Sequence, residues 1–315
     1  MGFQALLQRP NGEAWDISEL VVSAEVTDRI NQAGTCTLKM IGELHPEVGN
    51  ALVIRHDGTA CFAGYIFKTD FSHERTLSVT AHDQLYYLKA TDSRRFDNLT
   101  LDQIVSELAV TYGLRLGALA ATGYPLGSRP FDQKTPLDMI ASCIRATVLG
   151  TGQLYYIKDS GGFLTLRNIR SVVSGLCLEP GSILTGYQYS RSIDGDTFNQ
   201  IKLVRDNKDA GKREVYIAKD SETIRQWGLL QYYEKVDDGM NAEQIKEKAD
   251  ALLQLKTRVR QTLSLDALGD QSLRAGAVVC ARLPEVGLEK FLLCTCAKHS
   301  FSNAAHTVKV DLRMV

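Results

Sequence analysis

Along the stretch Gly34-Thr35-Cys36-Thr37-Leu38-Lys39-Met40, polar and apolar side chains alternate without a break. Cys36, Leu38 and Met40 fall on one face of an extended chain, and the polar residues between them fall on the other. An alternation of period two is typical of a β-strand with one buried face. The stretch is therefore predicted to be a half-buried β-strand.

The same pattern returns 163 positions later in the chain. At this shift Asn199, Ile201 and Leu203 correspond to Cys36, Leu38 and Met40. The shift also carries Leu20-Val21 onto Ile183-Leu184. Two further matches follow in the same order at larger shifts, Gly49–Arg55 with Gly276–Arg282 at 227 and Thr76–Ala81 with Thr307–Leu312 at 231.

The difference between the shifts of 163 and 227 means that the second copy contains 64 extra residues. A repeat at such wide spacing is not that of a solenoid, whose period is much shorter. The sequence therefore predicts an α+β protein that is mainly β, with two related antiparallel β-barrel domains and α+β insertions.

We expect four parts along the chain. The first β-barrel spans 1–90, and an α+β domain of two helices and a hairpin spans 91–175. The second β-barrel is formed by 176–205 and 259–315. A strand-helix-helix subdomain, 206–258, is inserted into it.

Local turn and capping patterns support these assignments. Asn11-Gly12, Asp57-Gly58 and Asp194-Gly195 each separate two predicted strands and favour tight hairpins, because such residues tolerate positive φ. Three helix starts are predicted by capping patterns: Thr100 with Gln103, Thr135 with Pro136, and Asn241 with Gln244.

Composition limits the possible functions. The 315 residues carry 36 basic and 37 acidic side chains, so no net field favours nucleic acid or an anionic membrane. No apolar run approaches the roughly 18 residues that span a bilayer, and no signal-peptide pattern begins the sequence. We expect a protein made in a cytoplasm, with its seven cysteines as reduced core thiols.

Two groups of residues were considered as sites. Asp159-Ser160-Gly161-Gly162 resembles the nucleophile motif of chymotrypsin-like proteases, and His82 lies upstream, but the motif falls where two alternating strands need a turn. Cys294, Cys296 and His299 offer three zinc ligands, but both cysteines fall on one face of a strand, which we expect to be the core, and a fourth ligand is missing.

No glycine-rich nucleotide-binding pattern occurs in the sequence. We therefore predict no catalytic, cofactor-binding or metal-binding residues. The other histidines, His45, His56, His73 and His306, are expected at the surface.

Several segments resemble the baseplate-hub proteins of contractile phage tails, especially the type found in defective prophages of Bacillus. The resemblance covers nearly the whole chain and rests on these segments: Thr80–Leu88, Phe96, Leu101–Leu114, Thr135–Ile140, Tyr155–Asn168 and Ala297–Leu312. His82 stands where an aromatic residue is expected in this family.

The resemblance implies a structural protein with two tube-protein-like barrels per chain. Three chains would form a homotrimer whose six barrels match a six-fold tail tube protein above and a three-fold spike protein below, beside other baseplate proteins. Such a protein is made in the bacterial cytoplasm and then resides in the baseplate of a virion or phage-tail-like particle. It needs no cofactor, and no specific nucleic acid or membrane is a partner. A tail-tip peptidoglycan hydrolase and a carbohydrate-binding β module remain alternatives.

Overall fold

The computed structural model describes residues 2–42, 44, 46–72, 76–169, 173–207, 211–302 and 305–314. His45 and His73 lie outside these ranges. The fold is mainly β and divides into two compact units, one of Met1–Gln188 with Leu263–Val315 and one of Tyr189–Thr262. None of the described helices has the length and apolar character needed to cross a membrane.

Five strands of the first unit form what we call the first array. It consists of β3 (Val21–Arg29), β4 (Thr35–Ile41), β5 (Ala51–His56), β6 (Thr59–Phe71) and β7 (Thr76–His82). Their spatial order is β3-β4-β7-β6-β5, continued by β1 (Phe3–Gln8) and β2 (Ala14–Asp16), with the 3-10 helix η1 (Ser18–Leu20) before β3. The predicted turn at Asp57-Gly58 is confirmed, with φ values of 47° and 78° between β5 and β6.

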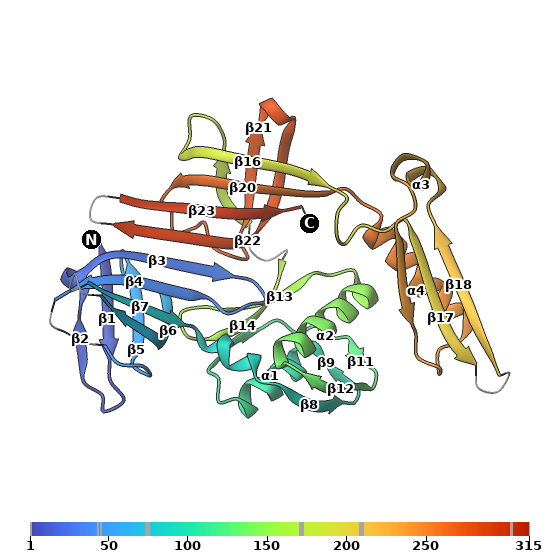
Figure 1. Ribbon diagram of the computed structural model, residues 1–315, viewed down its shortest axis with the longest axis horizontal. Coiled ribbons are helices and arrows are strands. Elements are labelled where there is room, and N and C mark those ends of the chain that lie inside the picture. Colours follow the sequence, from blue (N-terminus) through green and yellow to red (C-terminus); the bar gives the residue numbers. More distant parts are fainter. Residues whose placement is uncertain are drawn as a thin grey trace. The chain divides into compact units, whose positions relative to one another are not determined.

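A second array repeats this order. It consists of β16 (Leu184–Ser192), β20 (Arg260–Leu268), β21 (Val278–Leu283), β22 (Leu288–Ser302) and β23 (Ala305–Arg313), with η4 (Pro284–Val286) between β21 and β22. The spatial order is β16-β20-β23-β22, with β21 also on β22 and β15 (Val173–Leu178) parallel to β21. Figure 1 shows the two arrays joined where β22 lies beside β3.

The buried faces of the two arrays agree residue by residue. Cys36, Leu38 and Met40 of β4 are at most 2% exposed. A shift of 227 carries them onto Leu263, Leu265 and Ala267 of β20, which are at most 3% exposed. Each set forms the core side of its strand, and β4 and β20 hold the same place in the strand order.

Three expectations from the sequence are corrected here. Among the described residues the large antiparallel sheet runs as an open path, so closed barrels are not observed. The match of Asn199, Ile201 and Leu203 to β4 is wrong. Ile201 and Leu203 belong to a strand of a separate sheet, Asn199 directly precedes that strand, and β20 holds the matching place. The hairpin at Asp194-Gly195 is also wrong: β16 pairs with β20, and the chain passes from β16 into the second unit, which begins at Tyr189.

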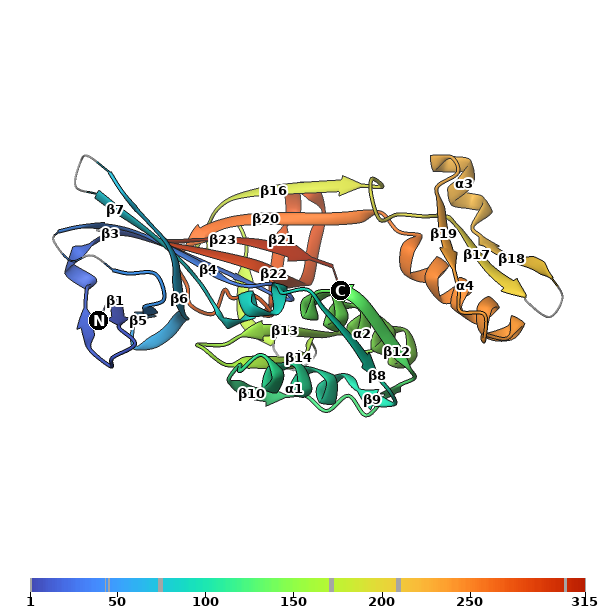
Figure 2. The same cartoon turned by 60° about the horizontal axis from the view of Figure 1, so that its bottom comes forward.

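In the part of the sequence between the two arrays, the chain forms an α+β module (Figure 2). Its elements are η2 (Gln84–Lys89), β8 (Asp92–Phe96), β9 (Leu99–Thr100), α1 (Leu101–Thr111), β10 (Leu116–Leu119), β11 (Pro125–Leu126), β12 (Arg129–Lys134), α2 (Pro136–Thr151), β13 (Tyr155–Asp159) and β14 (Leu164–Asn168). The predicted helix starts are confirmed, since the Gln103 side chain accepts from the Thr100 N–H and the Thr135 hydroxyl accepts from the Asp138 N–H. The apolar faces of both helices pack into one core with β13 and β14.

The second unit is a three-stranded sheet with one covered face. It contains β17 (Gln200–Asn207), β18 (Lys212–Lys219), α3 (Ser221–Trp227), β19 (Gln231–Lys235) and α4 (Ala242–Lys256). The predicted capping box of Asn241 with Gln244 begins α4. Ile245 and Ala249 of α4 pack with Ile201 and Leu203 of β17 in the core of this unit.

We predict that the segment 193–259 can be replaced by a two-residue Asn-Gly turn without unfolding the rest of the chain. The Leu268 N–H donates to the Ile183 carbonyl, so β16 and β20 run antiparallel and the ends at Ser192 and Arg260 are neighbours. Circular dichroism and thermal unfolding should show a native β spectrum and a cooperative transition.

Replacing 206–258 instead is the matched control. That deletion keeps β17 only up to Arg205 and removes its sheet partners and α4, so Ile201 and Leu203 would lose their cover and the product should aggregate. If the shorter deletion gives the better-folded protein, our placement of the insertion between β16 and β20 is wrong.

Candidate assembly interface

The protease-like motif of the sequence is a hairpin turn, as predicted. The Ser160 N–H donates to the Phe163 carbonyl, and the Asp159 carboxylate accepts from the Gly162 N–H at 2.7 Å. The Ser160 hydroxyl lies 3.5 Å from that of Thr165, whereas the imidazole of His82 lies 3.2 Å from the Thr35 hydroxyl and stacks on Tyr86. Ser160 and His82 thus interact with different groups.

The predicted common face of Cys294 and Cys296 is wrong. Cys294 lies opposite the buried Leu312, whereas Cys296 lies opposite Asp311, because the register of β22 slips between the two cysteines. An extra residue in a strand reverses the alternation of its side chains. Within the residues that the structure describes, no three His, Cys, Asp or Glu side chains gather as a metal ion would require.

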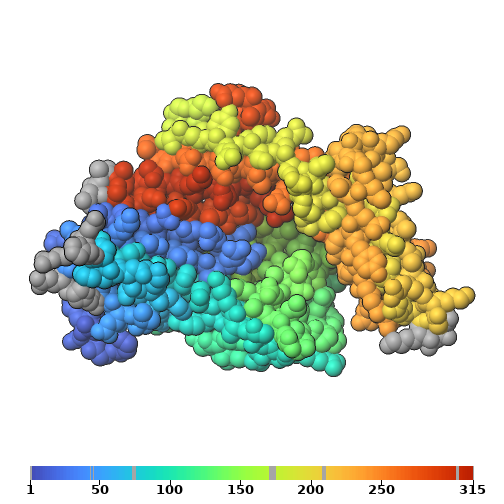
Figure 3. All heavy atoms as spheres, viewed as in Figure 1, coloured from blue at the N-terminus to red at the C-terminus, as the bar shows by residue number. Residues whose placement is uncertain are grey.

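The join between the two arrays is a backbone ladder. Seven residue pairs connect β22 to β3, from Cys296 opposite Arg29 to Ser302 opposite Ser23. Figure 3 shows the atoms of β22 and β23, in red, directly against those of the first array, in blue. Phe301 of β22 is 6% exposed and packs into the core of the first array. The ladder therefore joins two cores as well as two strand edges.

A repeated β-bulge identifies the counterpart of β22 in the first array. The register of β6 with β7 slips between Ile66 and Lys68, and that of β22 with β23 slips between Cys294 and Cys296. A shift of 228 carries the first pair of residues onto the second. β6 is therefore the counterpart of β22, including the point at which the strand bends.

Comparison of β6 with its counterpart β22 identifies one strand edge that is uncovered in the described part of the chain. Beyond its bulge β22 pairs with β23 on one side and with β3 on the other. Beyond its own bulge β6 pairs with β7, and no second strand adjoins Lys68–Asp70 within the described part of the chain. Phe71 is 59% exposed, whereas its counterpart His299, beside β3, is 2% exposed.

The other uncovered edge is β16, the counterpart of β3. It is the last strand of the sheet, paired with β20 among the described residues. Tyr187 and Tyr189 are half-buried, although their counterparts at the shift of 163, Ala24 and Val26, are buried beside β22. The sequence suggests the outer edges of the segments 23–40 and 186–204 as contact surfaces. Most of β16 lies in the second segment, whereas most of β3 lies in the first, and β3 already pairs with β22. Sequence reasoning missed the edge of β6, because strand neighbours cannot be read from alternation alone.

The module is tied to both arrays by a buried ion pair. The Lys158 amine of β13 lies 2.7 Å from the Asp28 carboxylate of β3 and donates to the Ala275 carbonyl at 2.9 Å. Tyr156 adds a hydroxyl bond to the Gly276 carbonyl. Gly276 has a φ of +89° and a Cβ there would lie 2.3 Å from the Tyr156 hydroxyl, so only glycine fits.

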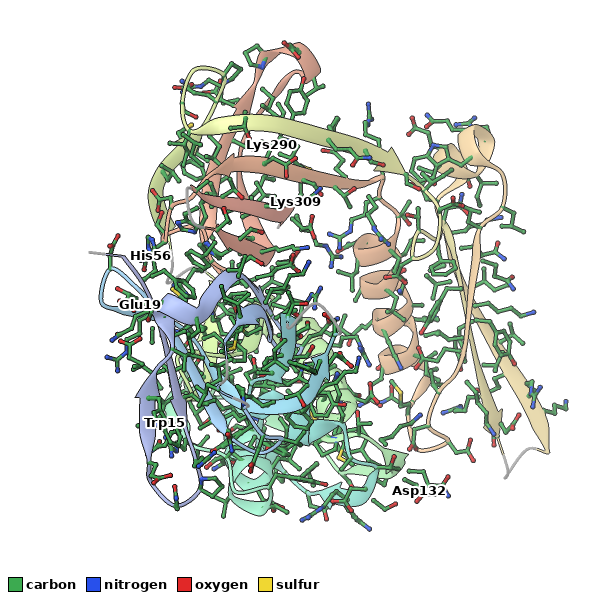
Figure 4. The ribbon with its side chains drawn as sticks, turned by 60° about the vertical axis from the view of Figure 1, so that its left-hand side comes forward. Trp15, Glu19, His56, Asp132, Lys290 and Lys309 are labelled. Atoms are coloured by element: carbon green, nitrogen blue, oxygen red, sulfur yellow. The ribbon has the colours of Figure 1, made fainter. Side chains whose placement is uncertain are left out.

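An aromatic and imidazole cluster packs below the ladder. His56 of β5, labelled in Figure 4, lies 4.7 Å from the ring of His306 and 5.2 Å from that of Phe301. His299 is buried, with Nδ1 3.0 Å from His306 Nε2 and Nε2 2.9 Å from the Leu273 carbonyl. His56 and His306 are half-buried, so the expected surface position of these two histidines is only partly met.

The sequence is similar to known proteins over most of its length. A family model described as YqbQ-like matches residues 25–313. The uncharacterized protein YqbQ of Bacillus subtilis strain 168 is 34% identical over 286 residues, which are 90% of this chain and 85% of that protein. Protein XkdQ of the phage-like element PBSX of the same organism is 33% identical over 267 residues, 84% and 81% of the two chains.

Solved structures share the fold. The 43 kDa tail protein of prophage MuSo2 from Shewanella oneidensis has a TM-score of 0.75 at 17% identity, with 98% of each chain covered. The E. coli c3393 protein, a type VI secretion component described as structurally similar to T4 bacteriophage tail proteins gp27 and gp5, has a TM-score of 0.59 at 10% identity, over 94% of this chain and 73% of that one.

We predict that His299 makes the fold sensitive to mild acid. Burial lowers the pKa of His299 from 6.5 to about 3, so the unfolded chain takes up a proton more readily than the folded one. The contribution of His299 to the free energy of unfolding is complete above the pKa that this residue has in the unfolded chain, and it is lost as the pH falls below that value. Between pH 7 and pH 5 the loss is about 2 kcal/mol.

Chemical denaturation at pH 7 and at pH 5 would measure this loss of stability. His299→Gln keeps hydrogen-bonding capacity but does not titrate, so the wild type should lose about 2 kcal/mol more than this variant between pH 7 and pH 5. An equal loss in both proteins would contradict the prediction.

Proposed function

The chain belongs to the YqbQ-like family, and we propose that it is a structural hub protein in the baseplate of a contractile phage tail or related injection particle. The repeated strand order of the two arrays is the observation that carries the proposal. The relative XkdQ belongs to a phage-like element, and the MuSo2 protein of the same fold is a tail protein. The proposed role is assembly, without an enzymatic reaction.

We infer that the two arrays are copies of one ancestral β unit. Both have the same strand order, the same buried positions and a bulge at the same place in their fourth strand. The division of the chain near residues 90 and 175 remains part of this proposal. We propose that the insertion into the second copy lies between β16 and β20, instead of spanning 206–258 as expected from the sequence.

The uncovered edges suggest how chains associate. Inside one chain, the edge of β3 meets β22, and the counterparts of these two edges are β16 and β6. Joining β16 of one chain to β6 of the next would repeat the internal ladder and cover two open strand edges. The two surfaces differ, so the contact is head-to-tail and forms a ring when it closes.

We propose that three chains close this ring. Six similar arrays would then match a six-fold tail tube, while the whole chain repeats three times for a three-fold spike. The tube protein, the spike protein and other baseplate proteins are the proposed partners. The location follows: assembly in the bacterial cytoplasm, then residence in the baseplate of the particle.

The internal ladder suggests a register for the proposed contact between chains. Thr27 lies opposite Lys298, so their counterparts at shifts of 163 and 228, Ser190 and Asp70, should lie opposite each other in neighbouring chains. Both are exposed in the single chain, so cysteines there should not disturb folding. We predict that Ser190→Cys with Asp70→Cys links neighbouring chains under mild oxidation in assembled particles, giving a band of three chain masses on non-reducing gels.

Thr185→Cys with Asp70→Cys is the out-of-register control, since Thr185 is also exposed on β16 but five residues away. It should give no trimer band. Equal cross-linking in both proteins, or a ladder that continues past three chains, would refute the proposed ring.

A second prediction concerns Phe71. Because its ring is 59% exposed in one chain but would be buried beside β16 of the next, Phe71→Lys should leave the unfolding temperature of the isolated chain unchanged within a few degrees and lower the yield of complete particles. Electron microscopy of lysates counts the particles. Exposed Val110 of α1 lies outside the proposed contact, so Val110→Lys is the control that should assemble normally. Normal assembly of the Phe71 variant would argue against this edge.

A further inference from the structure

Two cysteines face each other on the neighbouring strands β15 and β21, at the edge of the second array where β15 pairs with β21. Cys177 of β15 and Cys280 of β21 are register partners in a parallel pair, and their sulfur atoms lie 2.8 Å apart. In sequence they are separated by more than a hundred residues, so only the fold brings them together. The expectation that all cysteines are core thiols fails here, since both side chains are half-buried.

The pair lies on the solvent side of its strands. The residues that follow, Leu178 and Ala281, are fully buried and face the core. One step farther along, the Arg282 guanidinium lies 2.8 Å from the Glu179 carboxylate, and both of these groups are exposed. A small solute can therefore reach the sulfur atoms without displacing any core side chain.

We propose that Cys177 and Cys280 form a disulfide bond when the folded protein meets a small-molecule disulfide such as oxidised glutathione. The thiolate of one cysteine attacks the small disulfide, forms a mixed disulfide and releases one small thiol. The second thiolate then attacks the protein sulfur of that mixed disulfide, forms the bond between the two cysteines and releases the other small thiol. The protein loses two protons and two electrons, which the two released thiols carry.

The reaction should be slow and its product structural. Partial burial and the neighbouring Cys280 thiol raise the pKa of Cys177 to about 11, so little thiolate is present at neutral pH. Rapid redox sensing needs the opposite, a low pKa. A bond that forms slowly and then persists fits a protein that has left a reducing compartment for an oxidising one.

The bond would fasten a weakly held strand. β15 is paired with β21 and has no second strand partner among the described residues, and the pairing slips between Val173 and Cys177. β21 is anchored on its other side by six residue pairs to β22. Linking the two strands would close a very long loop of chain, which restricts the unfolded state strongly.

The timing of oxidation rests on the proposed function, because only a particle released by its host leaves the reducing cytoplasm. The chemistry itself does not depend on it. Thiol counts on the isolated full chain therefore test the disulfide, whatever its oligomeric state, and cross-linking through Ser190 and Asp70 tests the ring separately.

To test this proposal, the purified full chain is incubated with excess oxidised glutathione, and the glutathione is then removed. Thiol titration of the denatured protein should show loss of two of the seven thiols. Intact mass should fall by two hydrogen atoms, and peptide mapping should join the segments that contain Cys177 and Cys280. Reduction with dithiothreitol should restore all seven thiols and lower the unfolding temperature by several degrees.

Three single variants complete the design. Cys177→Ser and Cys280→Ser should each form no internal bond and show no rise in unfolding temperature on oxidation. Cys296→Ser, which removes another half-buried cysteine, should behave as the wild type. Seven titratable thiols after prolonged oxidation, or a bond mapped to any other pair, would overturn the proposal.

Discussion

The backbone ladder between β3 and β22 is the constraint on which the first unit depends. Without it each array would expose a strand edge with unpaired N–H and C=O groups, and Phe301 would lose its place in the core of the first array. The ladder also sets the distance over which Lys158 reaches both Asp28 and the Ala275 carbonyl. A buried amine is tolerated only when charge and hydrogen bonds are both supplied, and here two arrays must be in register to supply them.

Much of the fold could be predicted from the sequence, where the signal is local. The turn at Asp57-Gly58 and the starts of α1, α2 and α4 depend on neighbouring residues, and all of them are present. The place of the insertion could not be read so directly, because β17 and β20 both alternate with period two. Leu263, Leu265 and Ala267 are uniformly apolar, whereas Asn199 is polar, and this difference is the sequence signal that favours β20.

The features of the candidate interface were harder to predict for a physical reason. Thr295 carries no sign that β22 bends there, yet this bend turns Cys296 away from the face of Cys294. The exposure of Phe71 likewise depends on which strands adjoin β6 among the described residues, and no residue near Phe71 encodes that. Alternation tells which side of a strand is buried, whereas strand neighbours follow from contacts across the whole chain.

In the first array β3 and β4 are joined by a short turn, whereas the equivalent strands β16 and β20 are separated by most of the second unit. The insertion thereby makes the second array different from the first, although the two arrays are otherwise similar. In the proposed closed ring of three chains, a partner protein that contacts only the arrays would face six similar surfaces. A partner protein that contacts the second unit would face three. In the proposed ring, the asymmetric insertion would thus let a single polypeptide convert one rotational periodicity into its half.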